Sequence, residues 1–302
     1  MDKIAIIIVH YNTDEDTKET LSSLALIEAA GFEWQVLVVD NASKQPFMLP
    51  KGYKNVQVIR SDTNLGFSGG NNLGMATASR EFNPDYFLLL NPDTLVQPDF
   101  LVKLYQGLKQ HPDWGVTVPK IYFAPGCEFY LDNYKKADRG KVIWYAGGTL
   151  DWNNLLAEHI GVDELDRGQF DREQVTDFAT GCCVLARREV LATTGVFDER
   201  YFLYFEDADL SWRIRRAGFE LGYIPEAVVW HKNGSATQGS GSDLQTFYLT
   251  RNRLLFFATH GNWLVKQRVY RLAWRLWRHG SRVEKLAAGN FVRRKFGKQL
   301  AI

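Results

Sequence analysis

The stretch DYFLLLNPDTLVQPDF (residues 85–100) runs an apolar segment directly into a polar turn that holds one lone acid, Asp93. Five consecutive apolar residues, 86–90, are typical of a strand that is buried on both faces of a parallel sheet. Pro92 and Pro98 then end the strand, because proline lacks the backbone donor that a sheet needs. The stretch therefore predicts a buried strand that delivers a carboxylate to the edge of a sheet.

Further apolar runs come earlier in the chain, and helical segments separate them. The predicted strands are residues 4–9, 35–40, 56–60 and 86–90. One predicted helix begins at a Thr13 cap and ends at Gly31, and a second follows the glycine-rich segment NLGFSGGNN (64–72). Alternating strands and helices of this length predict an α/β fold whose parallel sheet has right-handed crossovers.

Polar residues follow several of these strands. Asp40, the segment 64–72 and Asp93 all come after strand ends, and ligands in such sheets bind beyond the carboxyl ends of the strands. Each is also a common turn former, but together they predict a nucleotide site. The segment has neither the G-x-G-x-x-G spacing of dinucleotide-binding enzymes nor a Walker-type loop. Its glycines would still let backbone N–H groups approach a diphosphate at a helix N-terminus.

Composition excludes several classes of protein. With 302 residues, 45% hydrophobic and 24% charged, the chain is long enough for one large domain or two small ones, and it is neither disordered nor fibrous. Its apolar runs are shorter than the roughly 20 residues that span a bilayer, and no signal peptide is expected. The three cysteines have no metal-ligand spacing, which favours a reducing compartment and a cytoplasmic protein.

The second half carries a pair of acids in an aromatic context. Glu206 and Asp207 begin a predicted helix that runs to Ala217, the aromatic segment 201–205 precedes them, and His231 ends a later apolar run. Acids in the first turn of a helix stabilise it through the helix dipole without any catalytic duty. Helix capping is therefore the alternative interpretation of this pair.

Taken in order, these motifs resemble the inverting glycosyltransferases of family 2, in their bacterial rhamnosyltransferase-like branch. The resemblance covers residues 4–260. It rests on IIIVHYN, VVDNAS, NLGFSGGNN, LLLNPD, TGCCVLARREV, FDERYFLYFEDADLSWR, VWH and FYLTRNRL. It implies the GT-A fold, which is Rossmann-like with a mostly parallel sheet and flanking helices. The charge pattern of the last 52 residues separately predicts a C-terminal basic amphipathic segment. We expect a GT-A domain over 1–245, with a nucleotide-sugar half (1–120) and an acceptor half (121–245), and a basic helical segment over 246–302.

The resemblance also implies a divalent cation, Mn²⁺ or Mg²⁺, on the diphosphate of the donor. Asp93 and His231 match the metal ligands of the family, and an imidazole ligand suits Mn²⁺ better than Mg²⁺. Many relatives have Asp-x-Asp where this chain has Asn91-Pro92-Asp93, so a neutral amide replaces the first carboxylate. The predicted site therefore has less negative charge for the metal.

The remaining roles are likewise carried over by resemblance. Asp207 is the expected base that takes the proton of the attacking hydroxyl, and the helix dipole should keep it ionised. The expected donor-binding residues are Tyr11, Asp40, Gly70, Asn71 and Asn91. The expected acceptor-side residues are Glu206, Gly181, Cys182, Trp212 and Arg213.

The predicted reaction is transfer of a sugar from a dTDP- or UDP-linked donor to a glycan or polyprenyl-diphosphate-linked acceptor in bacterial surface polysaccharide synthesis. Rhamnose is the leading donor sugar. A sugar-1-phosphate nucleotidyltransferase is one alternative, but it should open with a basic glycine-rich loop, and HYNTDED follows the first strand here. A non-catalytic sugar-binding protein is the other, although Asp93, Asp207 and His231 are all present.

Charge divides the chain unevenly. Residues 1–250 carry 23 Lys and Arg against 34 Asp and Glu, and residues 251–302 carry 13 against 1. On a helix over 263–282, the arginines 268, 271, 275, 278 and 282 form one basic stripe opposite Val265, Val269, Leu272, Ala273, Leu276 and Trp277. With its tryptophans, this segment predicts a helix that lies on an anionic membrane surface, with packing on the domain as the alternative. Nucleic acid is not expected as a partner, because the main domain is acidic.

Overall fold

A computed structural model describes residues 1–233 and 241–299 of the chain. Its strands are β1 (Asp2–His10), β2 (Phe32–Asp40), β3 (Val56–Arg60), β4 (Tyr86–Leu90), β5 (Thr94–Val96), β6 (Trp114–Phe123), β7 (Ile143–Tyr145), β8 (Gly148–Asp151), β9 (Leu156–His159), β10 (Gln174–Val175), β11 (Cys183–Arg187) and β12 (Glu220–His231). Its helices are α1 (Asp14–Leu24), α2 (Gly66–Glu81), α3 (Phe100–Gln110), the 3₁₀ turn η1 (Leu131–Asn133), α4 (Arg188–Thr194), α5 (Glu206–Arg216), α6 (Asp243–His260), α7 (Trp263–His279) and α8 (Arg282–Val292). The four strands expected in the first half are confirmed.

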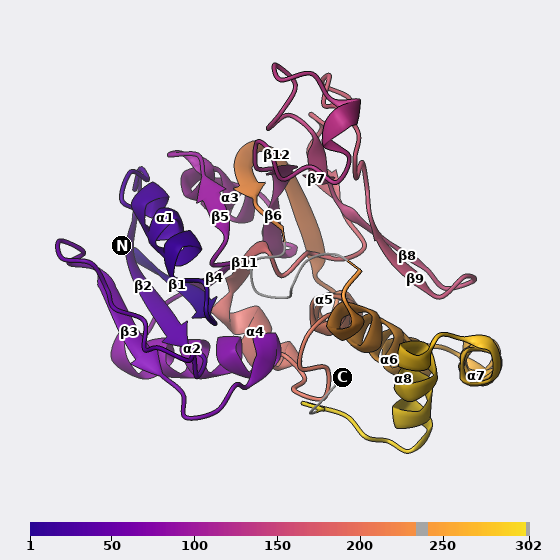
Figure 1. Ribbon diagram of the computed structural model, residues 1–302. Helices are drawn as coiled ribbons and strands as arrows, with labels where there is room; N and C mark the ends of the chain where they lie inside the picture. The colour runs from indigo at the N-terminus through magenta and orange to yellow at the C-terminus, as the bar shows by residue number, and fades with distance from the viewer. Residues whose placement is uncertain (234–240, 300–302) are drawn as a thin grey trace.

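Within the described residues, a ten-stranded sheet forms the centre of the fold, in the order β10-β12-β6-β11-β4-β1-β2-β3, with β5 on β12 and β7 on β6. β1 pairs in parallel with β2 and β4, and β2 with β3, as the alternating pattern predicts. The residues of β4 are all buried. This is the mixed α/β arrangement expected of a GT-A glycosyltransferase, with helices flanking the sheet (Figure 1).

One strand reverses direction at the middle of this sheet. β11 runs antiparallel to β4 and to β6, and its first residue, Cys183, lies opposite Leu90, the last residue of β4. The loop before β11 therefore meets the loop after β4, and the Asn91 N–H donates to the Cys182 carbonyl at 2.8 Å. This reversal places the segment 180–182 at the sheet edge that also holds Asp93.

The first helix is shorter than expected. α1 ends at Leu24, not at Gly31, because the chain turns away and the Glu28 N–H donates to the Pro98 carbonyl at 2.8 Å. Thr13 is the N-cap residue, but its side chain makes no capping hydrogen bond. Its hydroxyl lies 3.4 Å from Nδ1 of His10 instead.

The helices α6, α7 and α8 pack together at one end of the molecule (Figure 1). Their apolar faces share a cluster that includes Phe256, Phe257 and Val269, and this cluster also contains Tyr201 and Ala208 beside the predicted catalytic acids. The expected boundary between residues 245 and 246 falls inside α6.

The basic helix ends earlier than expected, and one tryptophan faces the other way. Arg282 starts α8, since Gly280 ends α7 and a capping box of Ser281 and Glu284 begins a new helix. Trp277, predicted on the packed side of α7, is instead 60% exposed. In the part of the chain that the structure covers, no helix is both long enough and apolar enough to cross a bilayer.

Candidate functional site

A cavity of about 650 Å³ opens where the ends of β1 and β4 meet the start of β11, the start of α5 and the end of β12. Most of the predicted site residues line it: Tyr11, Asn91, Asp93, Gly181, Cys182, Glu206, Asp207 and His231. These residues come from positions 11 to 231 of the chain. Of the polar groups that the sequence pattern placed at strand ends, Asp93 and the start of the segment 64–72 reach the cavity.

Asp93 and His231 form a buried pair at one side of this cavity. Oδ1 of Asp93 lies 3.1 Å from Nε2 of His231, and both side chains are less than a tenth exposed. The pairing of β5 with β12 sets this geometry, because His231 lies opposite Thr94 and the Lys232 N–H donates to the Asp93 carbonyl. The Lys232 ammonium in turn binds Asp16 and Glu19 of α1, which anchors the end of β12.

The pair suits a divalent cation in its donor atoms and spacing. Adjacent ligands about 2.1 Å from an octahedral ion lie about 3 Å apart, close to the observed separation of oxygen and nitrogen. Nδ2 of Asn91 lies 3.4 Å from the same ring nitrogen, so a neutral amide stands beside the pair. Among the described residues no three His, Cys, Asp or Glu side chains converge, and the protein offers two such ligands here.

Asp207, like its neighbour Glu206, is a first-turn acid of α5 that lines the cavity. One of its oxygens accepts from the Gly181 N–H at 3.1 Å and the other from the Ala208 N–H at 2.8 Å. Burial raises the pKa of Asp207, although these backbone N–H groups act to lower it. Burial therefore acts against the helix dipole, which was expected to keep Asp207 ionised. A raised pKa makes the ionised carboxylate a stronger proton acceptor.

Glu206 is more deeply buried, at 4% exposed, and its Oε2 has no hydrogen-bond partner among the described residues. Burial, followed by the negative charge of Asp207, raises the pKa of Glu206 well above its ordinary value. The neutral carboxyl is thereby favoured, and it can donate a hydrogen bond into the cavity. Two neighbouring acids are thus placed in different environments.

We expect Glu206→Gln to stabilise the fold at alkaline pH. A carboxyl whose pKa is raised by folding binds its proton more tightly in the folded state, so the free energy of unfolding falls as pH rises above the unfolded value. Glutamine cannot ionise, so the difference between variant and wild type should grow from pH 4 to pH 8, to the order of 1 kcal/mol. Urea unfolding across this range measures it. Glu33→Gln, at an exposed position, is the control. The prediction would be contradicted if the free energy of unfolding changed equally with pH in wild type, Glu206→Gln and Glu33→Gln.

The segment before these acids has an unusual backbone. Phe202, Tyr204 and Phe205 adopt positive φ angles of 66°, 66° and 70°. Bulky residues rarely occupy this region, at a cost of about 1–3 kcal/mol each, and such strain persists only where the surroundings enforce it. All three side chains line the cavity.

The donor-side predictions divide into two groups. Tyr11 and Asn91 line the cavity, whereas Asp40, Gly70 and Asn71 do not. The Asp40 carboxylate accepts from the N–H groups of Ser43 and Phe47 and pairs with Arg60. The other two are held within α2: a Cβ on Gly70 would lie 2.7 Å from Val9, and the Asn71 amide donates to the Phe67 carbonyl.

The amides at the start of α2 already have acceptors. The Leu65 N–H donates to Asn41 Oδ1 and the Gly66 N–H to Asn64 Oδ1, each at 2.8 Å. The Phe67 N–H donates to the Phe202 carbonyl at 2.7 Å. The sequence-based expectation that these amides approach a diphosphate therefore has no support in this geometry.

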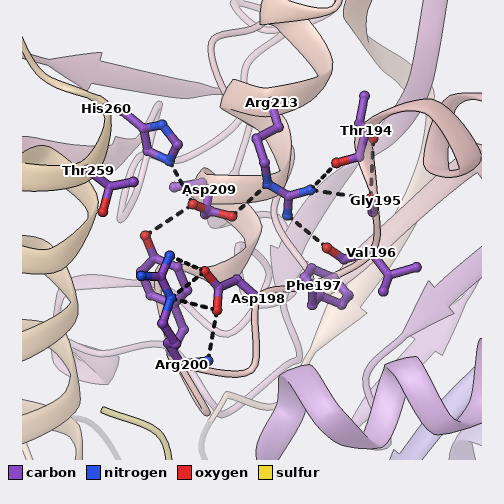
Figure 2. Close-up of polar contacts among 12 residues, drawn as sticks. Thr194, Gly195, Val196, Phe197, Asp198, Arg200, Asp209, Arg213, Thr259 and His260 are labelled. Carbon is purple, nitrogen blue, oxygen red and sulfur yellow. Dashed lines mark hydrogen bonds and ion pairs between the residues drawn. The ribbon is translucent and has the colours of Figure 1, made fainter. Parts of the chain in front are cut away.

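Two acceptor-side predictions lie outside the cavity lining. Trp212 packs on Trp152, with ring centroids 4.5 Å apart. Arg213 donates to Asp209 and to the carbonyls of Thr194, Gly195 and Val196, and Figure 2 shows its guanidinium turned toward that loop. Asp209 also accepts from Tyr201 and lies 2.7 Å from Nε2 of His260. This network ties α5 to α6 and to the loop after α4.

Sequence reasoning missed several residues that line the cavity. They are Asn41, Trp144, Glu158, His159, Phe178 and, from α6, Gln245 and Leu249. Burial lowers the pKa of His159 to about 4, and its Nδ1 lies 3.2 Å from the Trp144 carbonyl. Asn41 lies in the motif VVDNAS, directly after a predicted strand, so the sequence could have identified it as a site residue. Trp144, Glu158, His159 and Phe178 belong to no recognised sequence motif. They are identified only by the structure, in which β7, β9 and the loop before β11 contribute to the cavity wall.

Cys182 also lines the cavity. Burial raises the pKa of its thiol well above the ordinary value, so the thiol form is favoured and a nucleophilic role is disfavoured.

Comparison with known proteins agrees with this arrangement. The family described as "Glycosyltransferase like family 2" matches residues 2–246. The chain is 26% identical over 255 residues to the low-salt glycan biosynthesis hexosyltransferase Agl10 of Haloferax volcanii, which covers 84% of this chain and 75% of that protein. It is also 26% identical over 277 residues to the N-acetylglucosaminyl-diphospho-decaprenol L-rhamnosyltransferase of Mycobacterium tuberculosis. That match covers 87% of this chain and 86% of the relative.

A solved structure supports the fold. The crystal structure of GalNAc-T7 with UDP, GalNAc and Mn²⁺ superposes with a TM-score of 0.65 at 15% identity, over 98% of this chain. This chain spans 55% of the length of that solved chain. The family match covers most of the residues from which the cavity is built, and we conclude that the chain belongs to glycosyltransferase family 2, in its rhamnosyltransferase-like branch.

Proposed function

We propose that this protein transfers a sugar, with inversion, from a nucleoside-diphosphate sugar to a lipid-linked glycan, with dTDP-rhamnose as the leading donor and UDP-sugars as the alternative. One observation carries the proposal: the Asp207 carboxylate and the Asp93–His231 pair line the same cavity. Inversion requires a base on the acceptor side and a charge-stabilising group on the leaving side. In this proposal Asp207 is the base, and the Asp93–His231 pair holds the cation that stabilises the leaving group.

In the proposed step, Asp207 accepts the proton of the acceptor hydroxyl as that oxygen bonds to the anomeric carbon. The bond from this carbon to the diphosphate breaks, and the nucleoside diphosphate leaves. Asp93 and His231 would hold Mn²⁺ or Mg²⁺, which, when bound, offsets the charge that develops on the leaving diphosphate. Tyr11 is proposed to stack on the base, and Glu206 to donate a hydrogen bond to an acceptor hydroxyl.

A panel of nucleotide sugars, screened for protection against thermal unfolding, tests the donor. A ligand at 100 times its Kd adds about 2.7 kcal/mol to stability. The nucleotide sugar that protects the protein is then incubated with it and a diphospholipid-linked sugar. NMR determines the anomeric configuration of the product. A retained configuration, or nucleotide-sugar formation from a sugar 1-phosphate and a nucleoside triphosphate, would contradict the proposal.

We further propose that α7 docks the protein, from the cytoplasmic side, on the anionic inner face of the cell membrane. Trp263, Tyr270, Trp274 and Trp277 are 56% to 66% exposed, and their spacing of seven, four and three residues puts them on one side of the helix. Val265, Val269, Leu272 and Ala273 are buried on the other. Exposed arginines flank the aromatic side, an arrangement that suits an interfacial helix at an anionic surface.

We expect the full-length protein to cosediment with anionic but not with neutral vesicles. Replacing Arg271, Arg275 and Arg278 together by Gln should weaken binding by about 100-fold, because each cation adds about 1 kcal/mol at an anionic surface. Replacing the exposed Lys44, Lys51 and Lys54 together by Gln is the control that removes the same number of charges elsewhere. Deletion of 263–302 is unsuitable, since it would uncover the apolar face of α6. Unchanged binding of the triple variant would refute membrane docking.

A further inference from the structure

The strained segment 201–205 is held from α6 by one amide side chain. Asn252 is fully buried, and its Nδ2 donates to the carbonyls of Tyr201, Leu203 and Tyr204 at 2.9, 2.7 and 2.8 Å. An amide nitrogen has two hydrogens, so the three acceptors share them. The carbonyls can converge on one point only because the backbone there adopts positive φ angles.

Arg251 binds the start of the same segment and the residue before it. Its guanidinium donates to the carbonyls of Arg200 and Tyr201 at 3.1 and 2.9 Å, and to the Gly297 carbonyl at 2.7 Å. Its Nε donates to Asn252 Oδ1 at 2.9 Å, which fixes the orientation of the amide. Neither residue lines the cavity.

The opposite side of the segment is fixed by α2. The Phe202 carbonyl accepts from the N–H groups of Phe67 and Ser68 at 2.7 and 3.3 Å. Gly66 makes this approach possible, since a Cβ at that position would lie 2.3 Å from the Phe202 oxygen. The segment therefore bridges the first helix turn of the glycine-rich motif and the middle of α6.

We infer that Asn252, supported by Arg251, is a positioning residue for Asp207. Tyr204 and Phe205 lead directly into Glu206 and Asp207, so the carbonyls that Asn252 binds fix where the first turn of α5 begins. This inference rests on the proposed function, because it assigns to Asn252 the placement of the proposed base. Misplacement of a catalytic group by about 1 Å can lower the rate by about 100-fold.

Asn252→Leu tests the inference, because leucine fills the same volume without donors. We expect kcat for sugar transfer to fall by about 10- to 100-fold, while KM for the donor changes less than about threefold. The amides of 66–70 and 201–209 should exchange with deuterium faster than in wild type. Thr259→Val is the control on the same helix: it removes a hydroxyl whose one hydrogen bond, among the described residues, goes to the Leu255 carbonyl within α6.

A second variant covers the case in which leucine prevents folding. Arg251→Lys keeps the charge but removes the planar guanidinium that donates to the carbonyls of Arg200, Tyr201 and Gly297, and it should show the same pattern with a smaller effect. Unchanged exchange in both peptides, or kcat within threefold of wild type in a folded Asn252→Leu protein, would overturn the inference. If the wild type transfers no sugar, the proposed function fails, while the exchange measurement still decides whether Asn252 holds the segment.

Discussion

Asp207→Asn is expected to lower kcat by at least about 100-fold while leaving donor affinity near that of wild type. General-base catalysis contributes about 10²- to 10⁴-fold, and an amide cannot accept the hydroxyl proton. Asp207 lies in the first turn of α5, whose N-cap residue is Phe205, so a purely helix-stabilising role would change stability by about 0.3–1 kcal/mol and leave the rate almost unchanged. Steady-state transfer assays and donor titration by calorimetry separate the two effects.

The exposed Asp62→Asn is the control for this substitution. The pH profile gives a second check, because burial raises the pKa of Asp207. The base must be ionised, so kcat should decline with acidification through a pKa above the ordinary aspartate value of about 3.9. Retention of more than about a tenth of the turnover would remove Asp207 from the role of base.

Chelation of divalent cations is expected to abolish transfer, and Mn²⁺ or Mg²⁺ to restore it. A cation on the diphosphate supplies several kcal/mol of charge stabilisation, so the loss should exceed about 100-fold. Asp93→Ala and His231→Ala should each raise the Mn²⁺ concentration that gives half-maximal activity. Binding of Mn²⁺ itself, followed by paramagnetic relaxation, is the independent readout.

His279→Ala, an exposed position on α7, is the control for the histidine change. Full activity in excess chelator would show that neither Asp93 nor His231 serves a metal in catalysis.

The parallel half of the fold could be predicted because its signals are local. A continuous apolar run such as 86–90 is compatible with few positions other than a doubly buried strand, and the polar residues after each strand then fall on one edge. The same reasoning placed Asp93 at the sheet edge where the cavity lies, but it also placed Asp40 there, which does not line the cavity. Asp207 and His231 needed the family motifs, since nothing local places residue 231 beside residue 93.

Other features depend on tertiary contacts that leave no local trace. The segment 201–205, with its positive φ angles, is bound by Asn252, which is about 50 residues away in sequence. Arg213 was expected on the acceptor side by resemblance to the family. A helix turns about 100° per residue, so residue 213 points to a different side from residue 207 and reaches the loop carbonyls at 194–196.

α6 connects the cavity with α7, the helix proposed to dock on the membrane, and its length has a consequence for acceptor choice. Its first turns supply Leu244, Gln245 and Leu249 to the cavity wall, and its last residue is separated from α7 by only two residues. With 18 residues it is about 27 Å long. A helix of fixed length sets the distance between its two ends. If α7 lies on the membrane, the proposed base Asp207 is therefore held at a fixed height above the lipid. Acceptors would then be selected by how far their glycan rises from the carrier, and a series of acceptors with graded spacer lengths should give a rate maximum at one length.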